Sequence, residues 1–205
     1  LSVIYGQFRR VLNGQVMLTD FLFSYLDPGN ERNAAIDLGF RVNPASKPST
    51  NLHVLIGRNG VGKTTLLNNM VRAILPQEER TGVCGRFYEK NGWGGQSPLP
   101  NDYFSSVVSV SFSAFDPFLP PADQPDRSRG VAYFYIGMKA ARSGDATLPP
   151  KTDADLADDF LDSLKSCLSQ PAKRDRWLTA ITRLESDSNF ADMSLGQLLD
   201  MESEA

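Results

Sequence analysis

The feature that most restricts what this 205-residue sequence can fold into is a glycine-rich octapeptide, Gly57-Arg58-Asn59-Gly60-Val61-Gly62-Lys63-Thr64. It matches the phosphate-binding pattern G-x-x-x-x-G-K-[ST] at every fixed position. In that pattern, glycines let backbone N–H groups turn inward around phosphate oxygens, and the N-terminus of the following helix adds to the attraction. The octapeptide therefore predicts a site for the phosphates of a nucleoside triphosphate, which we expect to be ATP.

The segments on either side of the octapeptide support this prediction. The short apolar run 52–56 ends at the first glycine and predicts a buried strand. From Lys63, apolar residues recur at helical spacing until Pro76, which predicts a helix that starts within the loop. The order strand, loop, helix is the context that this pattern requires, and it makes a chance match in a surface loop a poor explanation.

The rest of residues 1–150 is predicted to be mainly β-structure around that loop. Residues 1–42 are rich in β-branched and aromatic side chains and indicate an antiparallel β-layer with a turn at 27–30. Further strands are predicted at 83–89, 107–112 and 131–136, whereas the glycines and proline of 91–98 fit no regular element. We expect one nucleotide-binding lobe over residues 1–150.

Residues 151–205 have a different character and predict a helical subdomain of the same domain. An apolar stripe runs from Leu156 to Leu168, preceded by Thr152 and Asp155 at capping-box spacing. A second stripe follows the break at Pro171. Aspartates at the start of the first helix favour the helix dipole and an exposed face, so we prefer a solvated cluster to a metal site there.

Composition and charge set limits on partners and location. A net charge of −3 argues against a nucleic-acid clamp built from this segment alone, because phosphate binding needs clustered Lys and Arg. No apolar stretch approaches the roughly 20 residues of a membrane helix, and no secretory signal opens the sequence. We expect a cytoplasmic protein that does not enter a membrane.

The longer string from Gly57 to Leu66 resembles the Walker A motif of ATP-binding cassette ATPases, a superfamily of transporters, SMC-type chromosome proteins and DNA-repair or defence nuclease ATPases. Asn59, directly before the second glycine, distinguishes this string from those of small GTPases. The resemblance is strongest over 52–75. It implies an α/β fold, an ABC-type P-loop ATPase head with an N-terminal antiparallel β-layer and a C-terminal helical subdomain.

The same resemblance assigns the site residues and the cofactors, ATP and Mg²⁺. Lys63 is the mobile catalytic cation, and the Thr64 hydroxyl completes the Mg²⁺ shell. The residues expected to bind the nucleotide are Gly57, Arg58, Asn59, Gly60, Val61, Gly62, Lys63, Thr64 and Thr65. No aromatic residue is clearly placed to stack on the base; Tyr25 and Phe40 are candidates that also suit a core.

The sequence departs from the family pattern at three places. Where the family has a glutamine that reaches the metal, this sequence offers Ser111, Ser113 and Asp116. The stretch 193–197 only partly matches the signature motif, with Leu195 in place of a glycine, so ordinary helix or loop is the better interpretation. No convincing Walker B is present, so the chain resembles the first part of an ATPase and alone should bind ATP but hydrolyse it very slowly.

These features leave three functions open. The leading hypothesis is an SMC-like or ABC-type head in which ATP joins two copies and controls a DNA-acting or defence-nuclease activity. It implies a homodimer or homo-oligomer through ATP, a nuclease or other effector partner, and DNA contact through the full assembly. The alternatives are the nucleotide-binding subunit of a transporter and a nucleotide-binding scaffold that does not hydrolyse ATP.

Overall fold

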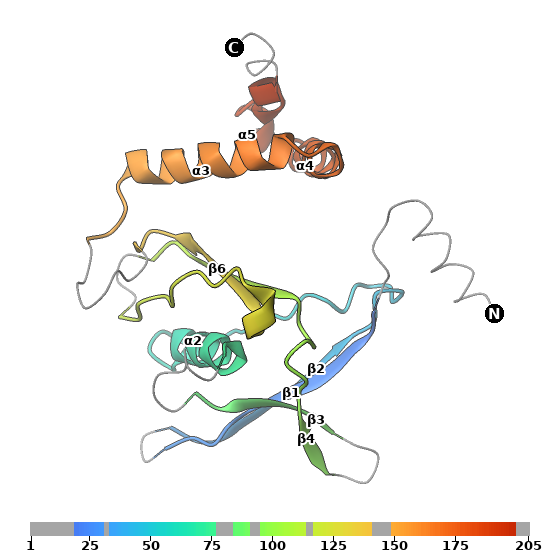
Figure 1. Ribbon diagram of the computed structural model, residues 1–205, viewed down its shortest axis with the longest axis vertical. Coiled ribbons are helices and arrows are strands. Elements are labelled where there is room, and N and C mark those ends of the chain that lie inside the picture. Colours follow the sequence, from blue (N-terminus) through green and yellow to red (C-terminus); the bar gives the residue numbers. More distant parts are fainter. Residues whose placement is uncertain are drawn as a thin grey trace, which may run out of the picture. The chain divides into compact units, whose positions relative to one another are not determined.

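A computed structural model describes residues 19–30, 33–76, 84–90, 95–113, 117–140 and 149–199 of the chain. The chain divides into two compact units, Leu1–Pro149 and Pro150–Ala205. The first contains both sheets and the helix that follows the glycine-rich loop, and the second is helical. The structure is thus mixed α/β, and each unit is described separately below (Figure 1).

An antiparallel sheet of four strands forms one layer of the first unit. It consists of β1 (Phe21–Asp27), β2 (Ile36–Val42), β3 (Arg86–Lys90) and β4 (Gln96–Pro98), in the order β2-β1-β3-β4. The predicted antiparallel layer is therefore confirmed for the described residues. The prediction that 91–98 lacks regular structure is wrong for 96–98. These residues pair with β3 as a short end strand, where a proline is tolerated.

Helix α2 (Lys63–Ile74) packs on this sheet and confirms the helix predicted after the loop. Leu66 and Ala73 are buried in a cluster with Tyr25 of β1 and Cys84, and Met70 packs against the same cluster. The Tyr25 hydroxyl donates a hydrogen bond to the Cys84 carbonyl at 3.0 Å, so the polar group at the centre of the core is satisfied. One face of α2 thus holds the core of the unit together.

A second sheet is a parallel pair, β5 (Ser106–Ser111) and β6 (Ala132–Gly137), which confirms both predicted strands. A short 3₁₀ helix, η2 (Arg127–Arg129), precedes β6. Side chains alternate between the two faces of the pair. Val107, Tyr133 and Tyr135 line a cavity and are buried or partly buried, whereas the alternate positions, Val108, Val110, Phe134 and Ile136, are exposed to solvent, and of these Val108 and Val110 also border the cavity.

The strand predicted before the loop is absent from this structure. Residues 52–58 have no regular secondary structure and belong to neither sheet. Leu52, Val54 and Ile56 are 79%, 72% and 88% exposed, so this apolar run is not buried either. The run carries the β-propensity of a core strand, but a strand needs hydrogen-bonding neighbours, and no described strand of this chain pairs with it. The prediction of a buried strand at 52–56 is therefore wrong for this structure.

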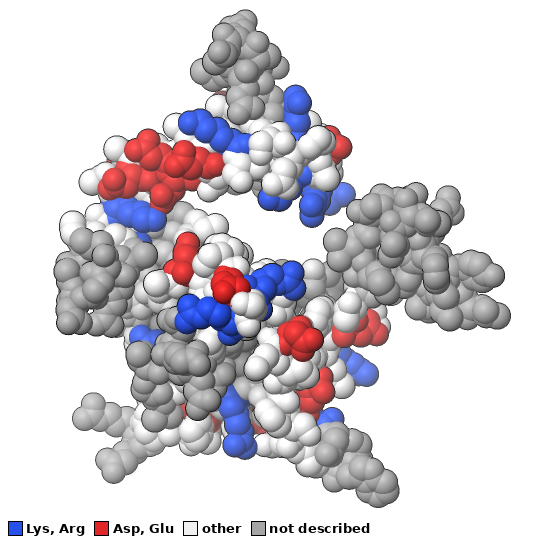
Figure 2. Space-filling model, viewed as in Figure 1, with Lys and Arg blue, Asp and Glu red and all other residues white. Residues whose placement is uncertain are grey.

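The second unit contains α3 (Asp153–Leu168), α4 (Pro171–Leu184), the short α5 (Ser188–Ala191) and the 3₁₀ helix η3 (Leu195–Leu199). The predicted capping box is present: the Asp155 N–H donates to the Thr152 hydroxyl, and the Thr152 N–H donates to the Asp155 carboxylate. Pro171 occupies the first turn of α4, where its missing N–H is not needed. Figure 2 shows acidic side chains gathered along α3.

Candidate functional site: the glycine-rich loop and the cavity beside α2

The backbone of the glycine-rich loop explains two of its glycines. Gly60 and Gly62 have φ values of 83° and 90°, in the left-handed region that side chains with a Cβ rarely adopt. A Cβ added at either position would meet no atom within 4 Å. Backbone conformation, and not lack of space, therefore requires glycine at these two positions. The space beside both Cα atoms is open.

The helix that follows begins without a side-chain cap. Gly62 is the N-cap residue of α2. Because glycine has no side chain, it cannot accept hydrogen bonds from the N–H groups of the first turn. The Leu66 N–H closes the first helical bond onto the Gly62 carbonyl at 2.8 Å, and the first turn contains no acidic residue. The positive end of the helix dipole therefore faces solvent without a counter-charge from that turn, which favours an anion.

Lys63 is folded over the loop. Its ammonium donates to the carbonyl oxygens of Gly57 and Arg58, at 2.8 and 2.7 Å. These neutral acceptors hold the charge beside the loop but do not neutralise it. A phosphate oxygen is a stronger acceptor for an ammonium group than a neutral carbonyl is, so Lys63 can exchange these partners for an anion that enters the loop.

The remaining predicted nucleotide-binding residues lie where a ligand could reach them. Arg58, Asn59 and Val61 are exposed, and Thr65 is partly buried in the first turn of α2. Thr64 is exposed and lines a cavity of about 750 Å³ beside α2. Its hydroxyl suits Mg²⁺, which takes oxygen ligands and keeps most of its shell as water and phosphate oxygens. Within the described residues, no cluster of three acidic, histidine or cysteine side chains offers an alternative metal site.

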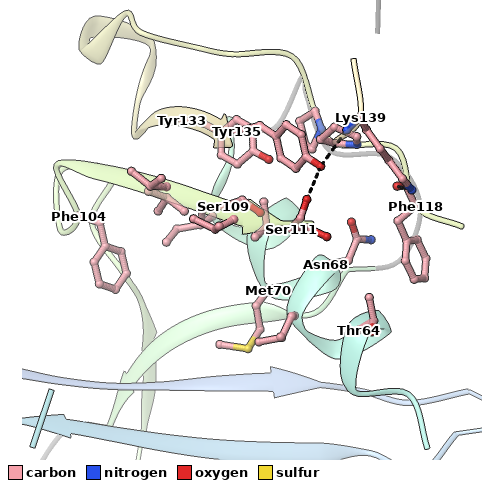
Figure 3. Close-up of a pocket in the computed structure, with 18 of the residues that line it drawn as sticks. Thr64, Asn68, Met70, Phe104, Ser109, Ser111, Phe118, Tyr133, Tyr135 and Lys139 are labelled. Carbon is pink, nitrogen blue, oxygen red and sulfur yellow. Dashed lines mark hydrogen bonds between the residues drawn. The ribbon is translucent and has the colours of Figure 1, made fainter. Parts of the chain in front are cut away.

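The cavity has an apolar part and a polar end (Figure 3). Aromatic rings of the antiparallel sheet and the loop before β5 form part of the apolar wall, among them Phe23, Phe87 and Phe104. Toward Thr64 the lining becomes polar, with the side chains of Asn68, Ser111 and Lys139, and Ser113 is a further polar residue of the lining. The first turns of α2 and the C-terminal end of β5 therefore contribute polar groups to the same end of one cavity.

A hydrogen-bonded group fixes the end of β5 at this cavity. The Tyr135 hydroxyl donates to the Ser111 carbonyl at 3.1 Å and accepts from the Lys139 N–H at 3.4 Å. The Lys139 ammonium donates to the Phe118 carbonyl at 2.5 Å. Gly137 is required opposite Ser111, because an added Cβ would lie 1.9 Å from the Ser111 carbonyl oxygen. Burial raises the pKa of neighbouring Tyr133 to about 12, so this phenol stays neutral at physiological pH.

The structure brings only some of the predicted residues together. Ser111 and Ser113 line the same cavity as Thr64, whereas Asp116 lies outside the described residues. The partial signature at 193–197 belongs to the second unit, where Ser194 has a φ of 49° directly before η3. Asp200, which follows an apolar run too short for a Walker B strand, also lies outside the described residues.

The two proposed base-stacking aromatics differ in this structure, because Phe40 lines the cavity and Tyr25 does not. Tyr25 is fully buried in the core, and Phe40 stacks on Phe23 with ring centroids 4.9 Å apart. Sequence reasoning also missed three polar residues of the cavity, Asn68, Tyr135 and Lys139. The spacing of Thr64 and Asn68 could have indicated Asn68, because residues four apart share a helix face.

Comparison with known proteins identifies one relative. The chain is 45% identical to Protein ea59 of Escherichia phage lambda over 199 residues, which is 97% of this chain and 36% of the relative. The chain thus spans about a third of the length of that protein. No family model matches, and no solved structure matches. None of the described helices is both long and apolar enough to cross a lipid bilayer.

Proposed function

We propose that this chain binds ATP with Mg²⁺ through residues 57–65 and forms part of an ABC-type or SMC-like ATPase head. The observation that carries the proposal is the combination of a complete phosphate-binding pattern with an uncapped helix N-terminus at Gly62 and a lysine held beside the loop by neutral carbonyls. Backbone N–H groups, helix dipole and ammonium all favour the same ligand, a polyphosphate anion.

The parts of this proposal rest on different grounds. Phosphate binding is argued from the loop itself. The ABC-type fold, ATP-driven pairing of two heads and control of a DNA-acting or nuclease partner are argued from the resemblance of residues 57–66 to that family's Walker A motif. The antiparallel layer under α2 is compatible with such a head, whereas the segment before the loop, which that fold would place in its sheet, is unpaired here.

The chain as given should bind ATP but hydrolyse it slowly. Phosphoryl transfer needs a positioned water and stabilisation of developing charge in addition to a phosphate cradle. Lys63 and Thr64 supply the cradle and a metal ligand, but the sequence contains no Walker B carboxylates. A scaffold that binds nucleotide without turnover is therefore the second candidate function, and transport the third, since it would require a membrane partner.

Equilibrium binding of ATP tests the proposal. Lys63→Ala should weaken binding in the presence of Mg²⁺ by roughly a hundredfold or more, because it removes charge-assisted hydrogen bonds to phosphate. Lys173→Ala on α4 removes the same charge from an exposed helix and serves as the control, with unchanged affinity. Equal ATP affinity for a folded Lys63→Ala protein and the wild type would refute the proposed site.

A further inference from the structure

Asn68 is an unusual residue within the cavity wall. Its side-chain nitrogen Nδ2 is buried, and it has no hydrogen-bond partner among the described residues. A buried amide donor without an acceptor costs stability, and most buried polar atoms of folded proteins avoid this condition. The neighbouring Asn69 shows the normal arrangement, because its Nδ2 donates to the Asp27 carboxylate at 3.2 Å. Of two adjacent asparagines on one helix, Asn69 thus has an acceptor for its side-chain nitrogen within the described part of the chain, and Asn68 does not.

The position of Asn68 supplies one. It lies one helical turn after Thr64 on the same face of α2, so both side chains point to the polar end of the cavity. Figure 3 shows the Asn68 amide between Thr64 and the group formed by Ser111, Tyr135 and Lys139. The hydrogen bonds from Tyr135 to Ser111, from Lys139 to Tyr135 and from Lys139 to Phe118 do not involve Asn68.

The missing partner of Asn68 must be an acceptor that is not part of the described chain. An amide N–H₂ donates only, so a metal cation cannot satisfy it directly. The ligand already inferred for Thr64 brings strong acceptors to this end of the cavity, the oxygens of the terminal phosphate. The Thr64 hydroxyl marks the metal-facing end of the loop, which is the end farthest from the nucleoside.

We propose that Asn68 and the polar end of this cavity recognise the terminal phosphate, so that they make the site selective for a triphosphate over a diphosphate. This inference rests on the proposed phosphate-binding function and adds a residue to it. Asn68 acts here as a specificity-determining residue: it donates from Nδ2 to an oxygen that ATP brings to the cavity and that ADP lacks. No bond is made or broken in this step.

The matched pair of asparagines provides the test. Asn68→Leu removes the amide at similar volume and also removes the unsatisfied donor, so the melting temperature without nucleotide should stay the same or rise. Its affinity for ATP with Mg²⁺ should fall about tenfold or more, because a hydrogen bond to a charged group is lost, whereas its affinity for ADP should change less than about twofold. Asn69→Leu should lower the melting temperature and leave the ATP-to-ADP affinity ratio unchanged.

Asn68→Asp is the second variant, because it keeps the shape and stays polar if the leucine is poorly tolerated. Replacing the donor by a carboxylate should weaken ATP binding at least as much as Asn68→Leu does, again with little effect on ADP. An unchanged ATP-to-ADP ratio in both variants would overturn the role of Asn68, while loss of binding in Lys63→Ala would leave the proposed function standing. Wild-type protein that binds neither nucleotide, or Lys63→Ala protein that binds both normally, would overturn the proposed function and this inference together.

Discussion

The two faces of α2 serve different purposes. The face with Leu66 and Ala73 is buried against the antiparallel sheet, where it packs with Tyr25 and Cys84. The face with Thr64 and Asn68 lines the cavity and includes an exposed hydroxyl and an unpartnered amide. Burial of the apolar face stabilises the fold, whereas the unpartnered amide on the cavity face costs part of that stability. The helix is therefore both a core element and one wall of the cavity.

The largest effect is expected on the buried face. Leu66→Ala should lower the free energy of unfolding by about 3 kcal/mol, because Leu66 is only 8% exposed and its removal leaves a hole beside Tyr25. Chemical denaturation followed by circular dichroism measures this change. Leu67→Ala is the control, since Leu67 is 53% exposed and should lose about 1 kcal/mol or less. Equal losses at the two positions would contradict the assignment of the faces.

A smaller effect on the free energy of unfolding is expected at the parallel pair β5 and β6, which forms another wall of the cavity. Gly137→Ala should destabilise the first unit by about 2 kcal/mol, because the new Cβ cannot coexist with the Ser111 carbonyl and the end of β5 must shift. ATP affinity should fall with it, since the shift displaces the wall that faces Thr64. Thermal unfolding and an ATP titration measure both quantities. Wild-type stability in this variant would mean that β5 and β6 do not approach as described.

The smallest effect on stability is expected at the loop end of the cavity face. Thr64→Ala should change the free energy of unfolding by less than about 0.5 kcal/mol, because the side chain is exposed. Its effect should appear in ligand binding, as loss of most of the Mg²⁺ dependence of ATP affinity. Chemical denaturation measures the free energy of unfolding, and ATP titrations with and without Mg²⁺ measure the Mg²⁺ dependence of ATP affinity. A Mg²⁺ dependence equal to that of the wild type would show that Thr64 is not a metal ligand.

How far the sequence could predict this molecule depends on how local each feature is. The helix after Lys63, the capping box at Thr152 and the strands β1 and β2 follow from short patterns of periodicity, capping and turn residues, and all are present. The exposed run at 52–56 shows the limit of such patterns. An apolar run carries β-propensity, but whether it forms a strand depends on neighbours that the run itself does not specify.

The candidate site divides in the same way. The loop residues 57–65 could be proposed as a phosphate site from sequence, because the motif predicts the left-handed backbone that is present at Gly60 and Gly62. The cavity could not, because Tyr135 and Lys139 reach it through the pairing of β5 with β6, a contact between segments far apart in the sequence. The unpartnered state of Asn68 is a property of packing and appears only in three dimensions.

The central claim is that the glycine-rich loop binds the phosphates of ATP, and the amide resonances of its two left-handed glycines report on this most directly. In ¹⁵N-labelled protein, addition of ATP with Mg²⁺ should shift the signals of Gly60 and Gly62 in a saturable manner, while Gly39 on β2 stays in place. The same titration of Lys63→Ala should leave all three unmoved at the same ATP concentration. Unmoved Gly60 and Gly62 in the wild type, or equal shifts in the variant, would contradict the account.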